Sequence, residues 1–125
     1  MKLTSSPIPI FRIFDLEKAR GFYCDYLGFK VDWEHRFDDE SPIYMQVSRG
    51  DLKIHLTEHY GDCTPGGAVF IPIDDIEKYQ KELSAKKYKY LRPGVETASW
   101  HAKLMELLDP FGNRLRFHQE LGDDA

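Results

Sequence analysis

Histidines and cysteines are the side chains of this sequence best suited to bind a metal or to attack a substrate. His55 and His59 stand four residues apart, which is the spacing of a zinc-binding pair on a helix. The residues around them indicate a strand end and a loop, where this spacing loses that meaning, and His35 and His101 approach them only if the fold allows it. An unorthodox metal site is one alternative. The other is that His55 is partly buried while His59 and His118 face solvent.

The two cysteines, Cys24 and Cys63, form no Cys-x-x-Cys motif and are too few for a disulfide framework. We expect two free thiols in a cytoplasmic protein. A nucleophilic role for Cys24 is the alternative, although an unpaired cysteine is more often a small buried apolar side chain.

Composition and charge exclude several classes of protein. The chain has 125 residues, 42% of them hydrophobic, with 17 basic and 21 acidic side chains and a net charge of −4. This acidic balance argues against a dedicated nucleic-acid-binding protein, which usually carries a basic stripe. No apolar run approaches the roughly 20 residues of a membrane span, and the first residues lack the apolar region of a signal peptide. We expect one cytoplasmic domain (1–125) without nucleic-acid or membrane partners.

Hydrophobic patterning predicts the order strand, helix, three strands, and it does so twice. Helices are expected from an Asp15 cap to residue 27, and from an Asp74 or Asp75 cap to about residue 83. Glycine-centred hairpins are expected at Gly50 and Gly112. The expected strands are 8–13, 29–34, 43–48, 52–57, 68–73, 88–91, 103–108 and 114–118.

The strand expected at 29–34 alternates apolar and charged residues. Because the side chains of a strand point alternately to its two faces, this alternation predicts two chemically different faces. One face is expected to carry Phe29, Val31 and Trp33, and the other Lys30, Asp32 and Glu34.

The two halves of the chain also resemble each other in sequence. Residues 13–18, Ile-Phe-Asp-Leu-Glu-Lys, align with residues 73–78, Ile-Asp-Asp-Ile-Glu-Lys, at a shift of 60. A repeat of this kind predicts duplicated modules, here at about 7–58 and about 67–119, followed by a frayed tail at 120–125. Two such modules can enclose a concave space, which is the usual setting of a small-molecule site.

Several short motifs carry a resemblance to a known superfamily. They are Phe-Asp-Leu at 14–16, Phe-Tyr at 22–23, Leu-Gly-Phe at 27–29 and Asp-Pro-Phe-Gly-Asn at 109–113. With these motifs in this order, the chain resembles the vicinal-oxygen-chelate superfamily, which includes glyoxalase I, extradiol dioxygenases and bleomycin-resistance proteins. The resemblance implies an α+β fold in which two βαβββ modules form a cupped mixed sheet.

Within the superfamily, residues 7–10 and 27–33 and the tryptophan at 100 most resemble the bleomycin-resistance proteins. This resemblance implies a homodimer that binds a cationic aromatic glycopeptide antibiotic of the bleomycin family at the subunit interface and sequesters it without chemistry. Pro9 is the expected hinge at which the first strand passes to the partner subunit. The residues that we expect to bind the ligand are Asp32, Trp33, Phe37, Tyr44, His55 and Trp100.

The enzymes of the superfamily hold a divalent metal at four places, which the resemblance puts near Ile8, His55, Ala68 and Arg116. Only His55 has a ligand atom suited to a metal, and a chelate needs two or three protein donors. We therefore expect no metal, no cofactor and no catalytic residue.

Other interpretations of these residues stay open. Trp33 could belong to the core or to a dimer contact, Trp100 could be structural, and Asp32 could be a solvated surface carboxylate. Tyr44 could line the core, and Pro9 could sit in a simple edge strand. The His-Ala sequence at 101–102 departs from bleomycin-resistance proteins, which usually place Gly and a polar or basic residue after the tryptophan. The alternative functions are a glyoxalase-type lyase, isomerase or dioxygenase that depends on a metal, and an uncharacterised small-molecule binder.

Overall fold

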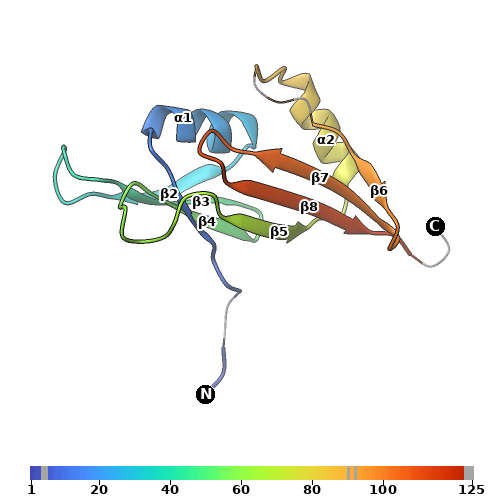
Figure 1. Cartoon of the computed structure of the whole chain (residues 1–125), viewed down its shortest axis with the longest axis horizontal. Helices are drawn as coiled ribbons and strands as arrows, with labels where there is room; N and C mark the ends of the chain where they lie inside the picture. Colours follow the sequence, from blue (N-terminus) through green and yellow to red (C-terminus); the bar gives the residue numbers. More distant parts are fainter. Residues whose placement is uncertain (4–5, 90, 92, 123–125) are drawn as a thin grey trace. The chain divides into compact units, whose positions relative to one another are not determined.

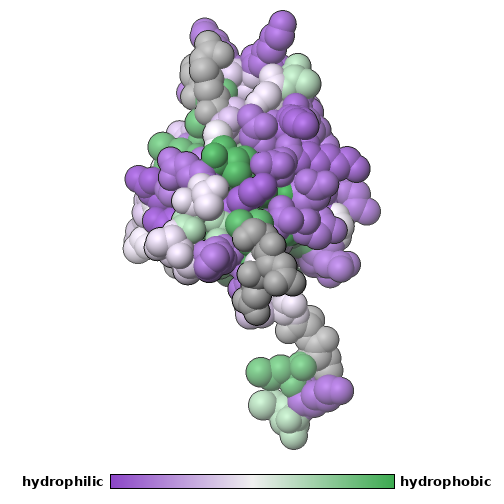
Figure 2. Space-filling model, turned by 90° about the vertical axis from the view of Figure 1, so that its right-hand side faces the viewer, coloured by the Kyte–Doolittle hydropathy of each residue, from purple (hydrophilic) through white to green (hydrophobic). Residues whose placement is uncertain are grey.

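The computed structural model describes residues 1–3, 6–89, 91 and 93–122. The chain divides into two units, Met1–Pro65 and Gly66–Ala125 (Figure 1). No helix in the described part of the chain is long and apolar enough to cross a membrane. The face drawn in Figure 2 is mainly hydrophilic, with hydrophobic residues in smaller areas between, as expected for a chain with 30% charged residues.

The first unit is a mixed sheet with a helix on one face (Figure 1). Along the chain come β1 (Ile10–Arg12), α1 (Leu16–Arg20), the π-helical segment η1 (Gly21–Tyr26), β2 (Lys30–His35), β3 (Tyr44–Arg49) and β4 (Leu52–Thr57). The strands lie in the order β1-β4-β3-β2. β1 is parallel to β4, and the other two pairs are antiparallel.

Alternation along the strands gives this sheet one buried face and one open face. Phe11, Leu56 and Met45 lie in one register row across β1, β4 and β3, and each is at most 2% exposed. The helical segment contributes the buried rings of Phe22 and Tyr26 to the same core. Tyr44 and Gln46 of β3 and His55 of β4 alternate with these buried residues and lie half-buried on the opposite face. This face is called the open face below, although Ser48 and Thr57 on the same face are buried.

The first helix begins at the predicted residue and changes form partway along. Asp15 Oδ1 accepts a hydrogen bond from the Lys18 backbone N–H at 2.9 Å, which is the geometry of an N-cap. From Gly21 the turns widen into η1, and the helical region ends before Gly28, whose φ is 81°. The spacing of apolar residues predicts an ordinary α-helix throughout. The wider turns instead bury all three aromatic side chains of η1.

The second unit repeats this plan. It contains β5 (Ala68–Pro72), α2 (Ile76–Ala85), β6 (Glu96–Ala98), β7 (Ala102–Leu108) and β8 (Arg114–Glu120). The strand order is β5-β8-β7-β6, with β5 parallel to β8 and the other pairs antiparallel. α2 packs against β7 and β8 and buries Ile76, Tyr79 and Leu83.

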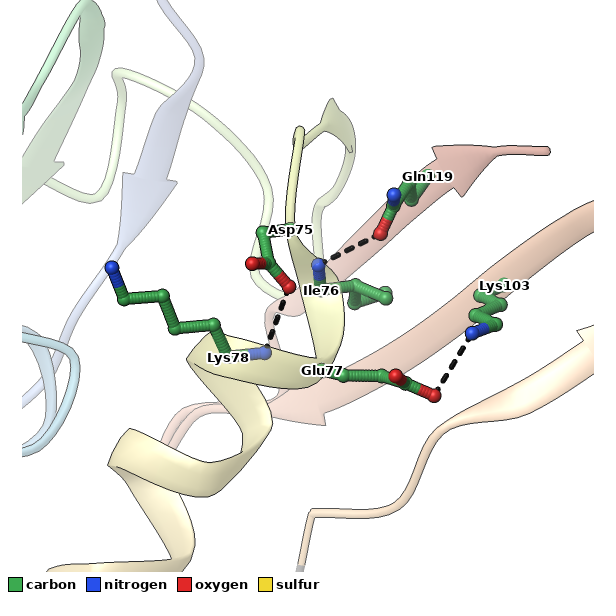
Figure 3. A network of polar contacts seen from close by, with 6 residues as sticks. All are labelled: Asp75, Ile76, Glu77, Lys78, Lys103 and Gln119. Atoms are coloured by element: carbon green, nitrogen blue, oxygen red, sulfur yellow. Dashed lines mark hydrogen bonds and ion pairs between the residues drawn. The ribbon is translucent and has the colours of Figure 1, made fainter. Parts of the chain in front are cut away.

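Polar contacts at the start of α2 join it to this sheet (Figure 3). Asp75, rather than Asp74, is the N-cap, because its Oδ1 accepts a hydrogen bond from the Lys78 N–H at 3.1 Å. The Ile76 backbone N–H donates to Gln119 Oε1 of β8 at 2.9 Å. Backbone N–H groups in the first turn of a helix have no acceptor within the helix, so this bond satisfies one of them. An ion pair of 2.9 Å from the same turn reaches β7.

Each unit contains a backbone hydrogen bond at the same place in its fold. The Ile13 N–H donates to the Thr57 carbonyl at 2.9 Å, and the Ile73 N–H donates to the His118 carbonyl at 2.8 Å. In each unit this bond joins the end of the first strand to the last strand. Together with the identical strand order, it confirms the α+β fold of two βαβββ modules that the sequence repeat predicts.

The strand predicted at 88–91 is wrong. Tyr88, Lys89 and Leu91 lie in no strand, and residue 90 lies outside the described residues, as do residue 92 and the tail residues 123–125. The Tyr-Lys-Tyr-Leu sequence favours a strand locally. The strand that forms a hairpin with β7 must instead end directly before the turn that leads into β7. That strand is β6, and the turn between β6 and β7 contains His101 at φ 59°.

The expectation that His118 faces solvent is also wrong. His118 is 8% exposed, and its ring stacks on Phe70 of the neighbouring strand with centroids 4.0 Å apart. His55 and His59 are both half-buried.

Candidate ligand-binding site

A β-bulge in β2 places Asp32 and Trp33 on the same face of the first sheet. Val31 pairs with Val47. The next residue in register is Trp33, which pairs with Gln46, so Asp32 is the extra residue of the bulge. The strict alternation expected along 29–34 is therefore wrong after Val31. An acidic and an aromatic side chain that are neighbours in sequence reach the open face together.

Three rings meet on this open face. Trp33 stacks on Tyr44 of β3, with ring centroids 6.0 Å apart and planes 9° apart. His55 of β4 meets both rings edge-on, with centroid distances of 5.3 Å to Trp33 and 5.1 Å to Tyr44. Trp33 is 42% exposed, so part of the indole stays open to a ligand.

A chain of hydrogen bonds links the same residues. Tyr44 Oη lies 2.7 Å from His55 Nδ1, and His55 Nε2 lies 2.9 Å from Gln46 Oε1. Gln46 Nε2 in turn donates to Asp32 Oδ2 at 3.0 Å. The chain crosses three strands and ends on a carboxylate, and it holds the His55 and Tyr44 side chains in place.

Gln46 also belongs to this site, although its residue type and its neighbours in sequence do not indicate a binding role. Ile10, His55, Gln46 and Trp33 form one register row across all four strands of the first sheet. The period of two along β3 is the signal that could have found Gln46, because it places Gln46 on the same face as Tyr44. Met45 lies between them and is fully buried, so Tyr44 belongs to the open face and not to the core.

The environment shifts the pKa values of three groups in the site. Hydrogen bonds from Gln46 and Ser48 hold the pKa of Asp32 below its ordinary value. Burial lowers the pKa of His55 and so favours the neutral imidazole at pH 7. Burial also raises the pKa of Tyr44, and the nearby charge of Asp62 acts in the same direction. At neutral pH the site therefore presents one carboxylate, a neutral histidine and a neutral phenol.

The remaining expected site residues lie elsewhere in the chain. Phe37 is 91% exposed and follows β2. Trp100 belongs to the second unit, where it lies in the turn between β6 and β7 and is 61% exposed. Pro9 directly precedes β1, and its carbonyl accepts a hydrogen bond from the His55 N–H at 2.9 Å. The structure thus brings together Asp32, Trp33, Tyr44 and His55.

The residues at the superfamily's metal places do not fit a divalent metal. Both ring nitrogens of His55 are already hydrogen-bonded, to Tyr44 and to Gln46. Arg116, at the corresponding place in the second unit, is a cation that lies 3.7 Å from a carboxylate oxygen of Glu106. Within residues 1–3, 6–89, 91 and 93–122, no three His, Cys, Asp or Glu side chains are grouped as a metal site requires. The His55 and Arg116 side chains therefore offer no free donor atoms for a chelate.

The equivalent face of the second unit has a different chemistry. Phe70, Arg116 and Glu106 occupy the register positions of Ile10, His55 and Gln46. Arg116 and its strand neighbour at position 114 both pair with Glu106, at 3.7 and 2.7 Å. Ion pairs thus stand where the first unit has the aromatic cluster and its hydrogen-bond chain.

The protein belongs to the class of α+β proteins built from two βαβββ modules. One of its modules carries an open aromatic face beside a carboxylate. Residues 3–124 match the family described as glyoxalase superfamily protein, and the chain belongs to this superfamily. Membership agrees with the superfamily that the sequence motifs predict. A search of curated proteins gives no match.

Solved structures with the same fold include proteins that bind antibiotics. A bleomycin-binding protein complexed with bleomycin is 24% identical, with 94% of this chain and 99% of that chain covered and a TM-score of 0.71. A bleomycin resistance determinant encoded on the transposon Tn5 is also 24% identical, with coverages of 94% and 98% and a TM-score of 0.72. The antibiotic-binding protein TnmS3 from Streptomyces sp. CB03234 is 20% identical, with coverages of 95% and 99% and a TM-score of 0.66. These likenesses show the fold.

Proposed function

We propose that this protein binds and sequesters a cationic, partly aromatic antibiotic of the bleomycin type and performs no reaction on it. The binding surface in this proposal is the open face of the first sheet, around Trp33 and Asp32. An aromatic part of the ligand stacks on the exposed indole, and a positive group lies beside the carboxylate.

The observation that carries the proposal is the bulge that places Asp32 beside Trp33 on one face. The indole, stacked on Tyr44, is held in place but 42% exposed. A stacked aromatic pair contributes about 0.5–1.5 kcal/mol beyond the area that it buries. The Asp32 carboxylate stays ionised because its hydrogen bonds lower its pKa, so it attracts a cation at neutral pH.

The solved structures support the ligand class. The bleomycin-binding protein was solved with bleomycin, and TnmS3 is described as an antibiotic-binding protein. Both cover 94% or more of this chain, so the shared fold includes the strands that carry the proposed binding surface.

A binding role fits the donor atoms of the site better than catalysis does. His55 uses both ring nitrogens in hydrogen bonds within the protein, and burial raises the pKa of the half-buried Cys63 thiol. A neutral thiol is a weak nucleophile, and both nitrogens of the imidazole are directed at protein groups and not at a ligand.

The proposal extends to assembly and location through the resemblance to bleomycin-resistance proteins. We propose a cytoplasmic homodimer in which Phe37 and Trp100 complete the ligand site and Pro9 is the hinge of an exchanged first strand. Cys24 and Cys63 are free thiols, which the reducing cytosol maintains.

The test is a fluorescence titration of the protein with copper-bound bleomycin. The chain has two tryptophans, so the variants Trp33→Phe and Trp100→Phe each leave one of them as the reporter. We expect saturable quenching in the wild-type protein and in Trp100→Phe, where Trp33 reports. Copper without drug serves as the control for quenching by the metal.

Absence of saturable quenching below about 100 μM drug would contradict the proposed ligand, because it limits the binding free energy to less than about 5.5 kcal/mol. Quenching that persists only in Trp33→Phe would move the binding surface to the second unit. Static light scattering on the same samples tests the dimer, and a mass of 14.6 kDa would contradict it.

A further inference from the structure

The hydrogen-bond chain on the open face runs from Tyr44 through His55 and Gln46 to Asp32. Asp32 determines which group donates and which accepts at each step. An ionised carboxylate only accepts hydrogen bonds, so Asp32 requires the Nε2 group of Gln46 as the donor. The other end of the same amide is then an oxygen, and this Oε1 faces His55 Nε2 at 2.9 Å. His55 must therefore carry its proton on Nε2.

The tautomer of His55 in turn determines that Tyr44 is the donor in the bond between the two side chains. A neutral imidazole protonated on Nε2 has a lone pair on Nδ1. Tyr44 Oη lies 2.7 Å from Nδ1, so the phenol donates its only proton to His55. The half-buried Tyr44 oxygen then has no proton left to donate, so in any further hydrogen bond it can only accept.

We infer that this face selects ligands that donate a hydrogen bond to Tyr44 Oη from an N–H group next to the aromatic ring that stacks on Trp33. In this arrangement Gln46 is a positioning residue. Its amide donates to Asp32 and accepts from His55, and this sets the His55 tautomer that accepts the Tyr44 proton. The inference rests on the proposed function, since it names the ligand group that the same face recognises.

The same arrangement disfavours ligands whose polar group can only accept. A carbonyl or carboxylate over this face would meet the lone pairs of Tyr44 Oη, with no proton between the two oxygens. A ligand carboxylate would also be repelled by Asp32. An amide N–H, an amine or an ammonium group meets neither obstacle, so the class of ligand is an aromatic N–H donor.

The first test uses the protein without ligand and measures the His55 tautomer by long-range proton–nitrogen NMR. We expect the proton on Nε2 in the wild-type protein. Asp32→Asn is expected to raise the share of the Nδ1–H form, because an asparagine can donate as well as accept and no longer forces the direction of the Gln46 amide.

Lys30→Met is the matched control. Lys30 lies 3.8 Å from Asp32 in an exposed ion pair but is not part of the chain, so its loss should leave the tautomer unchanged. A proton on Nδ1 in the wild-type protein, or an Asp32→Asn variant with an unchanged tautomer, would overturn the assigned direction.

The second test compares naphthalene-1-acetamide with its N,N-dimethyl derivative, a pair in which only the first has an N–H donor. Binding is followed by the chemical shift of the Trp33 indole N–H. We expect the donor amide to bind at least about fivefold more tightly, and Tyr44→Phe to remove this preference while it keeps a ring for stacking.

The two probes separate this inference from the proposed function. Equal binding of both amides, or binding of neither, would overturn the selectivity for a donor whether or not the protein binds bleomycin. A preference for the donor amide without any binding of copper-bound bleomycin would support the inference and reject bleomycin as the ligand.

Discussion

Trp33 and Tyr44 stack with ring planes 9° apart although they are not directly opposite each other in the sheet. Trp33 pairs with Gln46, and Tyr44 pairs with His35. The two rings therefore touch along the diagonal between neighbouring antiparallel strands, which long aromatic side chains can span. This diagonal contact leaves the place directly opposite Trp33 to Gln46, which joins the hydrogen-bond chain instead.

The exposed half of the Trp33 ring should be energetically important for ligand binding and not for folding. We expect Trp33→Ala to weaken the binding of copper-bound bleomycin by about 1 kcal/mol, because one stacking surface is lost. Isothermal titration calorimetry measures this change. Tyr60→Ala, at an 86% exposed aromatic residue of the same unit, is the control that should bind normally. Equal affinities of all three proteins would remove Trp33 from the site.

Trp100 provides a separate test of the second unit. It is 61% exposed in a turn, so its ring contributes little to the core. If it completes the ligand site, Trp100→Ala should weaken binding by about 1–2 kcal/mol. An unchanged dissociation constant in the same calorimetric assay would assign Trp100 to a structural role.

Adjacent residues of β3 should respond very differently to truncation. Met45 is fully buried, so Met45→Ala should lower the free energy of unfolding by about 2–4 kcal/mol through loss of contacts and creation of a cavity. Gln46→Ala, on the open face, should lower it by less than about 1.5 kcal/mol, the net value of a typical hydrogen bond. Urea unfolding followed by circular dichroism measures both. The reverse order of the two losses would contradict the assignment of faces.

The N-cap of α2 distinguishes two adjacent aspartates. Only Asp75 accepts the hydrogen bond from the Lys78 N–H. Asp75→Ala should therefore lower the free energy of unfolding by about 1 kcal/mol. Asp74→Ala is the matched control and should have little effect. A loss of stability confined to Asp74→Ala would show that the helix begins one residue earlier.

The stability of the protein should fall in mild acid because of His55. Burial lowers the pKa of His55 in the folded protein, so the unfolded chain takes up its proton first, near pH 6.5. The free energy of unfolding should therefore decrease as the pH falls below about 6.5 and through the lowered pKa. The lowered pKa of Asp32 acts only below about pH 4, outside this range.

Urea unfolding at about pH 7.5 and about pH 5.5 measures this effect, since these values bracket the ordinary histidine pKa. His55→Gln should lose less stability between the two pH values than the wild-type protein, because the other four histidines are common to both. An identical loss in the two proteins would show that His55 does not titrate in this range.

Much of the fold could be predicted because its signals act over a few residues. Asp15 and Asp75 cap their helices through the N–H three residues later, and Gly50 and Gly112 adopt positive φ at hairpin turns. The sequence repeat extends these local signals into two βαβββ modules. Local signals place a strand at 88–91, whereas the structure has β6 at Glu96–Ala98, because the position of this short strand depends on pairing with β7 and on no strong local preference.

The sequence by itself determined the order of the elements, the duplication and the list of aromatic and acidic candidates, because each depends on residue type and short spacing. Only the tertiary structure decided which of these residues meet. The bulge that turns Asp32 and Trp33 to one face depends on the register between β2 and β3. The chain from Tyr44 through His55 and Gln46 to Asp32 depends on three strands lying side by side. Such contacts join residues far apart in sequence, and no local pattern specifies them.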